Sequence, residues 1–511
     1  MTSTTNPPVT HASTPPPGPA TRWLPLGAAL GLAWGLLAGW WTPRGPLTTA
    51  EAVASIAISL LVGAAAGLLT RSRWPMLLTP LAFVVGVELA RAGVTGPSVD
   101  LPRLSEYGLF AFVTGRGVHG LLSVVPMVLG AAYGAGVART WAARRSPGAG
   151  ATGRGGWHVW RVLRALVAGA TAAALVLLVV ALVRPARTDA ITGSSATPVA
   201  ELTTVRAGGH DLRLMVRGHD VSAPVLLFLA GGPGGSELGA MRRHLPELEE
   251  HYVVATLDQR GTGASYSELD PTSTYTLDRA VQDVVDVTAY LRDRFDTDTV
   301  VLSGQSGGTV VGVLAVQREP AAYSAFVGVG QMVSQVETDR IFYSDTLAWA
   351  RRAGEGDLAA DLERIGPPPY DSMLDYETAL SHEQEVYPYD HTGNSEGSGG
   401  FSENFLVEEY SLLDQVHLLP AFMDTFSVLY PQTQEAVDFR RTARTLPVPV
   451  FFVQGAHEAR GRQEPFEQWY AALSAPSKDL VVLDRSGHRP LFEQPEEFVA
   501  YLAGPVLDAV R

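Results

Sequence analysis

The sequence contains no cysteine, and Lys478 is its only lysine. Without cysteine the chain has no disulfide framework, no thiolate metal site and no cysteine nucleophile. Arginine supplies nearly all of the positive charge, and the acids outnumber the bases to give a formal net charge of −14. No motif in the sequence calls for a metal or another cofactor, and we expect none.

Charge is divided unevenly along the chain. Residues 1–184 carry a net charge of +10, and residues 185–511 carry −24. Over 511 residues this division indicates two physically different parts. The acidic part repels phosphate backbones, so no nucleic-acid partner is expected. Residues 1–21 are rich in Pro, Thr and Ser without an apolar period, which predicts a disordered tail.

Long apolar segments follow this tail. Each approaches the about 20 residues that a helix needs to cross about 30 Å of hydrocarbon. The pattern predicts a transmembrane region over residues 22–184, with membrane lipid as a partner and about five helices at 23–41, 52–70, 74–92, 119–138 and 165–183. The first segment also resembles a signal peptide, but the downstream segments and the long uncharged leader favour an anchor.

The arginines predict the orientation of these helices, because cationic short loops tend to stay in the cytoplasm. Six lie between the last two segments: Arg139, Arg144, Arg145, Arg154, Arg161 and Arg164. We therefore expect that loop inside and everything after residue 184 outside the cytoplasm, whereas a further span through 107–113 would reverse the topology. Glu88 lies within a predicted span. Because Arg91 follows three residues later, we expect the two side chains to form an ion pair, and we do not expect Glu88 to have a functional role.

The acidic part alternates short β-branched runs with helical stretches. This pattern predicts a mostly parallel sheet covered on both faces, with strands at 199–206, 210–217, 224–230, 252–257, 299–304, 323–329, 448–455 and 479–484. The gap before the seventh run is too long for a connection inside a compact sheet. We expect a core of residues 185–330 and 446–511, with residues 331–445 inserted as a partly helical lid.

A nucleophile motif follows the fifth predicted strand. Residues 300–308 read V-V-L-S-G-Q-S-G-G, in which a β run meets G-x-S-x-G and then a helical segment. Glycines permit the strained turn that lifts Ser306 above a sheet, as in an α/β-hydrolase fold. A serine needs a general base, which in this fold follows the last strand, and His488 has that position.

The acid that orients the histidine is expected after the seventh strand. Glu458 fits best because it lies three residues beyond Gly455, and Glu464 and Asp484 remain rivals. His457, beside Glu458, is expected to be a surface residue.

Backbone amides are expected to hold the developing oxyanion. One is that of Gly307, and the other comes from Gly231 or Gly232 in the loop F-L-A-G-G-P-G-G-S. Gly231 and Gly234 are expected to contact substrate, because glycine permits close approach.

Three motifs together resemble the proline iminopeptidase-like branch of the α/β-hydrolases, serine peptidases that release N-terminal residues. They are A-G-G-P-G at 230–234, D-Q-R-G-T-G-A-S at 258–265 and G-H-R-P-L-F-E-Q-P at 487–495. The resemblance covers about 199–330 and 445–505. It implies Ser306, Glu458 and His488 as the triad, and Gly232 with Gly307 as the oxyanion hole.

The sequence departs from this family at three positions. Ala230 replaces a histidine, Gly307 replaces a tryptophan after the nucleophile, and Glu458 replaces an aspartate. In the family, that tryptophan shapes the pocket. Because it is missing here, a preference for proline does not follow from the resemblance.

The resemblance also implies lid carboxylates that bind the substrate's free amine. The lid offers several acids, among which the sequence does not choose: Glu383, Glu385, Glu403, Glu408 and Glu409. Asp258 and Arg260 are expected to brace the loop after the fourth strand.

These observations favour a membrane-anchored serine aminopeptidase that acts on short peptides outside the cytoplasm through an acyl-enzyme. An esterase or amidase with the same triad is the first alternative, because fold and triad do not fix the scissile bond. A catalytically inert ectodomain that binds a ligand is the second.

Overall fold

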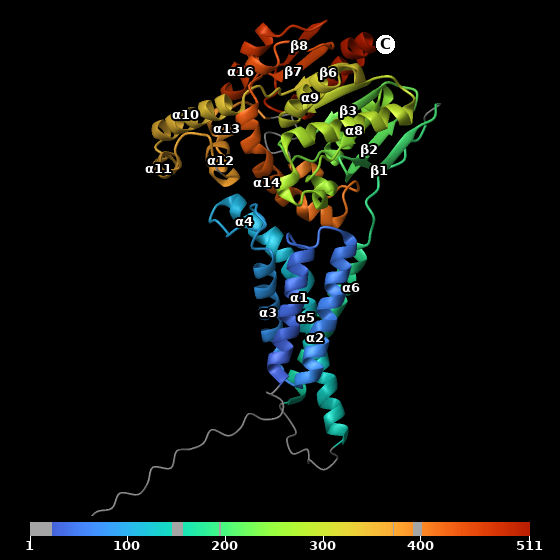
Figure 1. The fold of residues 1–511 in the computed structure, drawn as a ribbon, viewed down its shortest axis with the longest axis vertical. Helices are drawn as coiled ribbons and strands as arrows, with labels where there is room; N and C mark the ends of the chain where they lie inside the picture. Colours follow the sequence, from blue (N-terminus) through green and yellow to red (C-terminus); the bar gives the residue numbers. More distant parts are fainter. Residues whose placement is uncertain (1–22, 146–156, 194–195, 371, 392–400) are drawn as a thin grey trace, which may run out of the picture. The chain divides into compact units, whose positions relative to one another are not determined.

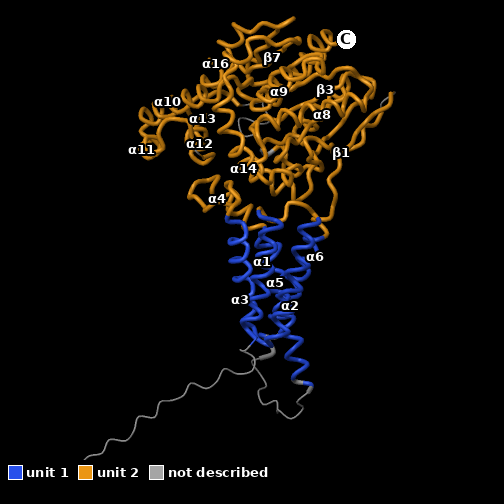
Figure 2. The backbone as a smooth tube through the Cα atoms, in the orientation of Figure 1, with its two compact units in different colours: residues 1–43, 50–92, 119–179 blue, residues 44–49, 93–118, 180–511 orange. Residues whose placement is uncertain are grey.

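The computed structural model describes residues 23–145, 157–193, 196–370, 372–391 and 401–511. The predicted tail at 1–21 and Arg154 lie outside these residues. The chain divides into two compact units, coloured separately in Figure 2. Unit 1 contains residues 1–43, 50–92 and 119–179, and unit 2 contains residues 44–49, 93–118 and 180–511. Two segments that lie between apolar helices in the sequence therefore belong to the unit with the sheet.

Apolar helices make up unit 1 (Figure 1). The principal helices are α1 (Leu24–Trp41), α2 (Thr49–Thr70), α3 (Pro75–Ala90), α5 (Val118–Arg145) and α6 (Trp157–Leu182). Within the described residues, four helical segments are long and apolar enough to cross a membrane: Leu24–Trp41, Thr49–Thr70, Glu106–Ala142 and Val162–Leu182. The fifth predicted span forms α3, a shorter apolar helix of 16 residues. The number of spans stays a prediction.

Glycines let these helices pack closely. A Cβ atom on Gly31 of α1 would lie 2.2 Å from the carbonyl oxygen of Thr79, and one on Gly35 would lie 2.1 Å from that of Phe83. Small residues at such positions let helix backbones approach each other within a membrane. Glu88 and Arg91 on adjacent turns form the predicted ion pair.

Residues 107–113 do not form a separate helix. They lie in α4 (Glu106–Phe112) and the start of η2 (Val113–Gly117), which continue into α5 as one helical segment. That segment of 37 residues is much longer than the about 20 that a span requires. Its first part, up to Val118, belongs to unit 2.

An eight-stranded sheet forms the centre of unit 2, in the order β1-β2-β4-β3-β5-β6-β7-β8. Strands β1 and β2 are antiparallel to their neighbours, and the other pairs are parallel. The bounds confirm the eight predicted strands: Val199–Ala207, His210–Gly218, Val225–Leu229, Val253–Leu257, Val300–Gln305, Tyr323–Val329, Val450–Gly455 and Lys478–Leu483.

Helices cover both faces of this sheet. Alternate residues of β3 face opposite sides, so that Leu227 packs in one core and Phe228 in the other. The first core includes residues of α8 (Leu277–Phe295), α9 (Gly307–Arg318) and α16 (Arg460–Ala472). The second includes residues of α7 (Leu238–His244), α17 (Pro490–Glu493) and α18 (Pro495–Tyr501). The predicted α/β-hydrolase architecture is confirmed.

The insertion between β6 and β7 is largely helical. It contains α10 (Gln335–Ala353), α11 (Gly356–Ile365), α12 (Met373–Leu380), α13 (Glu383–Val386), η7 (Phe401–Asn404), α14 (Leu412–Ala436) and α15 (Phe439–Thr442). The longest, α14, begins at a capping box made by Ser411 and Asp414. Thr425 on α14 donates to the carbonyl oxygen of Gly261 at 2.6 Å, which ties the lid to the loop after β4.

A buried polar cluster joins segments 44–49 and 93–118 to the rest of unit 2. Arg44 donates to Asp270 at 3.0 Å and also pairs with Asp424 of α14. The backbone N–H of Ser98 donates to Asp424 at 3.0 Å, and the Tyr266 hydroxyl donates to it at 2.6 Å. A buried arginine is stable only when paired, so this cluster fixes both segments to α14.

Candidate active site

Ser306 lies on a strained turn between β5 and α9. Its backbone has φ 50° and ψ −122°, a positive-φ conformation that L-residues rarely adopt. A Cβ on Gly304 would lie 2.7 Å from the Gly308 backbone, so the turn requires glycine there. This is the strand, turn and helix geometry that exposes a serine nucleophile.

A hydrogen-bonded chain connects the three residues that the sequence predicts as a triad. His488 Nε2 lies 2.7 Å from Ser306 Oγ, and His488 Nδ1 lies 2.6 Å from Glu458 Oε2. The rivals lie elsewhere: Glu464 pairs with Arg460, and Asp484 is exposed and accepts a hydrogen bond from Gln494. The structure therefore brings together Ser306, His488 and Glu458.

Arg462 is an active-site residue that the sequence analysis missed. Its Nε donates to Glu458 Oε1 at 2.7 Å, and its Nη2 donates to Glu383 on α13. Burial alone would raise the pKa of Glu458, but attraction to Arg462 and His488 outweighs it and lowers the pKa to about 2. The signal in the sequence was the position of Arg462, four residues after Glu458.

Glu493 holds the loop that carries His488. Its carboxylate accepts the backbone N–H of Gly487 at 2.9 Å and that of Arg489 at 3.0 Å. The neighbouring Gln494 accepts the backbone N–H of Arg485 at 2.8 Å. The Glu-Gln pair of the motif at 487–495 thus fixes the histidine from both sides. His457 is exposed and stacks on Tyr389, as expected of a surface residue.

The glycine loop after β3 lies beside the nucleophile. A Cβ on Gly231 would lie 3.1 Å from Ser306 Cβ, and one on Gly307 would lie 2.1 Å from the carbonyl oxygen of Gly232. Gly307 is the first residue of α9, so its N–H has no partner within the helix. Among the described residues, no hydrogen bond uses the backbone N–H of Gly232 or Gly307.

The motif at 258–265 braces this region without entering the cavity. Asp258 is buried and accepts the backbone N–H of Ala264 and the Tyr410 hydroxyl, both at 2.9 Å. Arg260 makes a buried two-bond pair with Asp283 at 2.9 and 2.7 Å. Both residues occupy the bracing positions that the sequence predicts.

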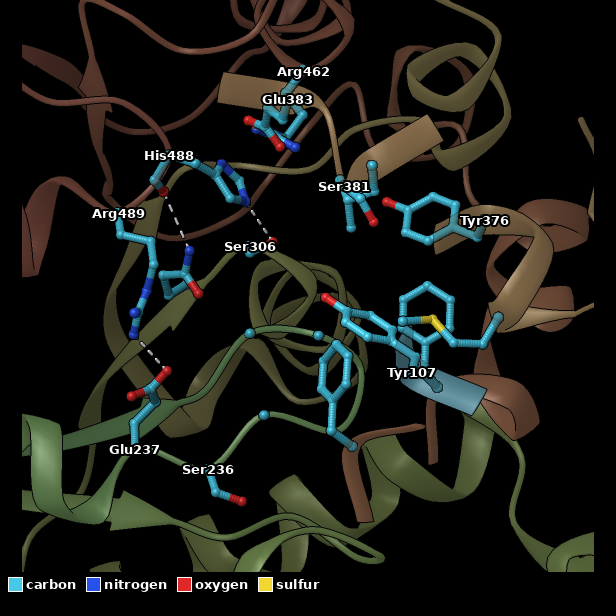
Figure 3. A pocket seen from close by; sticks show the side chains of 18 of the residues that line it. Tyr107, Ser236, Glu237, Ser306, Tyr376, Ser381, Glu383, Arg462, His488 and Arg489 are labelled. Carbon is cyan, nitrogen blue, oxygen red and sulfur yellow. Dashed lines mark hydrogen bonds and ion pairs between the residues drawn. The ribbon is translucent and has the colours of Figure 1, made fainter. Parts of the chain in front are cut away.

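A cavity of about 480 Å³ opens over Ser306 (Figure 3). The core contributes the glycine loop, Ser306 and His488, and the lid contributes residues of α12, α13 and α14. Its lining also includes Tyr107, Glu237, Gln305, Asn404, Arg462 and Arg489. Gly231, predicted to contact substrate, lines the cavity. Gly234, predicted for the same role, packs against the Phe422 backbone and is not among the lining residues.

Three carboxylates line this cavity: Glu237, Glu383 and Glu385. Glu237 is buried and pairs with Arg489 at 2.7 Å. The exposed Glu385 makes no hydrogen bond or ion pair with a described residue. The other lid acids named from the sequence pair outside the cavity, Glu403 with His244, Glu408 with Arg187 and Glu409 with Arg242. In the described part of the chain, no group of three or more His, Asp or Glu residues is placed to hold a metal.

Comparison with known proteins shows similarity over part of this chain. Probable aminopeptidase YbaC of Bacillus subtilis (strain 168) is 26% identical over 322 residues, 60% of this chain and 96% of the relative. The 2-hydroxy-6-oxo-6-(2'-aminophenyl)hexa-2,4-dienoic acid hydrolase of Metapseudomonas resinovorans is 29% identical over 136 residues, 26% of this chain and 44% of the relative. The crystal structure of a proline iminopeptidase-related protein from Thermus thermophilus aligns at 20% identity and TM-score 0.43, covering 61% of this chain and 98% of its own.

The model of one protein family matches residues 226–501, and its description is alpha/beta hydrolase family. This range is more than half of the chain and includes Ser306, Glu458, His488 and the lid between β6 and β7. The chain therefore belongs to the alpha/beta hydrolase family.

Proposed function

We propose that this protein is a membrane-anchored serine aminopeptidase that removes N-terminal residues from short peptides through an acyl-enzyme. The observation that carries the proposal is the hydrogen-bonded chain from Ser306 through His488 to Glu458. It is supported by the 26% identity to a relative named as a probable aminopeptidase, of which 96% is covered.

Acylation uses His488 as the general base. Ser306 Oγ attacks the carbonyl carbon of the substrate's first residue while its proton passes to His488 Nε2, 2.7 Å away. Glu458 accepts the Nδ1–H of the imidazole and stabilises the imidazolium that forms. Its low pKa keeps this carboxylate ionised at neutral pH.

The oxyanion of the tetrahedral intermediate accepts hydrogen bonds from the backbone N–H groups of Gly307 and Gly232. The intermediate collapses when the carbon–nitrogen bond breaks and His488 donates its proton to the leaving amine. A water molecule, deprotonated by His488, then attacks the acyl-enzyme and releases the first residue.

An aminopeptidase also needs an anion for the substrate's α-ammonium group, because a desolvated ammonium requires a paired charge. Glu385 suits this role since it lines the cavity and has no cationic partner among the described residues. Glu383 lies two residues away and is already paired with Arg462. We assign Glu385 to the ammonium group, with Glu383 adding to the negative potential.

A substrate panel tests the proposal. The purified full chain should hydrolyse N-terminal aminoacyl anilides, and blocking their amine by acetylation should lower kcat/KM at least tenfold. Glu385→Gln should remove much of that difference, whereas Asp390→Asn, an exposed lid change outside the cavity lining, should preserve it. Rapid hydrolysis of acyl nitrophenyl esters without turnover of any anilide would instead identify an esterase.

The proposal also places the catalytic unit outside the cytoplasm, supported by the arginines at the end of α5 and the start of α6. Because the chain has no cysteine, single cysteines report topology directly. In intact cells, an impermeant maleimide should label Ser222→Cys, in an exposed turn of unit 2, but not Ser72→Cys, between α2 and α3. The reverse pattern would invert the topology.

A further inference from the structure

Tyr107 reaches the active-site cavity from outside both the hydrolase core and the lid. It lies on α4, in segment 93–118, which is between the apolar helices α3 and α5 in the sequence. Figure 3 shows its side chain extending into the cavity, with the hydroxyl on the side of Ser306. From the sequence alone, residues 107–113 are evident only as part of a possible span.

A buried carboxylate of the lid fixes the start of α4. Glu377 of α12 is 5% exposed. Its Oε1 accepts the backbone N–H of Tyr107 at 3.0 Å, and its Oε2 accepts the Ser105 hydroxyl at 2.9 Å. Ser105 also caps α4 by accepting the backbone N–H of Gly108 at 3.0 Å. Together these bonds set the position from which the Tyr107 side chain leaves the helix.

The same segment is held a second time by α14. Ser98 donates its backbone N–H to Asp424 at 3.0 Å, within the buried cluster around Arg44. Helix α14 also carries Phe422 and Phe426, which line the cavity. Segment 93–118 is therefore fixed to two lid helices that both form walls of the site.

Aromatic and apolar side chains surround Tyr107 at this end of the cavity. Tyr107, like Tyr376 and Phe422, packs against a buried cluster that includes Met373 and Phe426. The rings of Tyr376 and Phe426 lie 5.2 Å apart, and those of Phe422 and Phe426 lie 5.9 Å apart. The carboxylates Glu383 and Glu385 lie on α13, which follows α12. The cavity thus combines an anionic region, suited to an amine, with an aromatic region, suited to an apolar side chain.

We propose that Tyr107 is a specificity-determining residue, whose ring forms one wall of the subsite for the substrate's first side chain and limits it to small and medium apolar groups. The inference rests on the proposed aminopeptidase function and adds a determinant from the segment between membrane helices. One methylene in an apolar pocket changes kcat/KM by about 10- to 200-fold. Replacing the Tyr107 ring should therefore change kcat/KM by a measurable factor.

Two substitutions of opposite sign test the proposal in the full chain. Tyr107→Ala should raise the ratio of kcat/KM for phenylalanyl over alanyl anilide at least tenfold, because it opens the wall. Tyr107→Trp should lower the same ratio. Leu109→Ala is the matched control, since Leu109 lies on the same helix and is 58% exposed, and it should leave the ratio within about twofold of the wild type.

Labelling by a fluorophosphonate separates failure of this inference from failure of the proposed function. If wild-type protein is labelled and cleaves anilides but both Tyr107 variants keep the wild-type ratio, Tyr107 is not a determinant. If the wild type is labelled but cleaves no anilide, the aminopeptidase function fails first. A Tyr107 variant with wild-type labelling has an intact triad, so a changed ratio is then a change in specificity.

Glu377 is a positioning residue in this account, and it provides a second test. Glu377→Ala should shift the substrate ratio in the same direction as Tyr107→Ala. The double variant should shift the ratio little further, because one substitution displaces and the other removes the same Tyr107 ring. Glu377→Gln retains an acceptor for the Tyr107 N–H and should restore most of the wild-type ratio. An equal loss for all substrates in Glu377→Ala would indicate a purely structural role and contradict the positioning role.

Discussion

Arg462 and Glu458 form a buried ion pair of 2.7 Å within the candidate catalytic site. The other oxygen of the carboxylate lies 2.6 Å from His488 Nδ1, so Glu458 connects Arg462 to His488. Through Glu383, the same guanidinium connects this acid to the lid.

Removing that arginine should change the acid stability of the protein. The pKa of Glu458 is about 2 in the folded state, below its usual value. Its ionisation therefore stabilises the fold above the unfolded pKa of about 4.3, and this contribution of about 3 kcal/mol is lost as pH falls toward 2. Arg462→Met should flatten the dependence of unfolding free energy on pH between about 2 and 4.3, as measured by denaturation in detergent.

Arg351→Met is the control for this change, because Arg351 forms an exposed pair with Glu363, away from Glu458. It should keep the wild-type pH dependence of stability over the same range. Equal slopes for Arg462→Met and the wild type would refute the charge-partner role of Arg462.

Replacing the orienting carboxylate should reduce turnover severely. Glu458→Gln keeps the shape but favours the wrong imidazole tautomer, which costs about 10⁴ in kcat in the serine protease that serves as the reference case. Glu464→Gln and Asp484→Asn should keep kcat within about twofold, since neither residue hydrogen-bonds His488. Single-turnover experiments measure the rate of Ser306 acylation directly. Acylation at the wild-type rate in Glu458→Gln would show that another group orients His488.

The loop that carries His488 should depend on Glu493. Glu493→Ala leaves the buried N–H groups of Gly487 and Arg489 without their acceptor, at a cost of about 1 to 3 kcal/mol for each. We expect a lower melting temperature and at least tenfold slower fluorophosphonate labelling. Glu496→Ala, an exposed change three residues later, should alter neither quantity. Labelling of Glu493→Ala at the wild-type rate would show that the loop keeps its conformation without Glu493.

The close helix contact in unit 1 predicts which glycines tolerate a side chain. Gly35→Val would place a Cβ 2.1 Å from the Phe83 carbonyl oxygen, so α1 and α3 must separate. Overpacking of this kind costs about 1 to 3 kcal/mol and should reduce the yield of monodisperse protein in detergent. Gly169→Val in α6 is the control, because a Cβ at this position would meet nothing within 4 Å, and it should behave like the wild type.

Local patterns predicted much of the fold and the arrangement of the candidate site. Strands β3 to β7 were evident because buried parallel strands are nearly continuous apolar runs. The order of Ser306, Glu458 and His488 along the chain follows from the topology of the sheet. Arg462 lies four residues after Glu458, and Glu493 lies within the last motif, but the partners of both residues became evident only in three dimensions.

Other features had no local signal. The Tyr107 backbone bonds a glutamate 270 residues away, and Arg44 pairs with an aspartate 380 residues away. Nothing in the composition of either segment distinguishes a loop between apolar helices from part of a hydrolase unit. Contacts at such separations depend on the folded lid, which is why the sequence alone places segments 44–49 and 93–118 in the membrane region.

The most direct test of the account is to map the site of fluorophosphonate modification by mass spectrometry of the full chain. The account predicts a single adduct on Ser306 in the wild type, no adduct in Ser306→Ala, and greatly slowed labelling in His488→Ala. Absence of an adduct on folded wild-type protein, or an adduct on another residue that persists in Ser306→Ala, would contradict it.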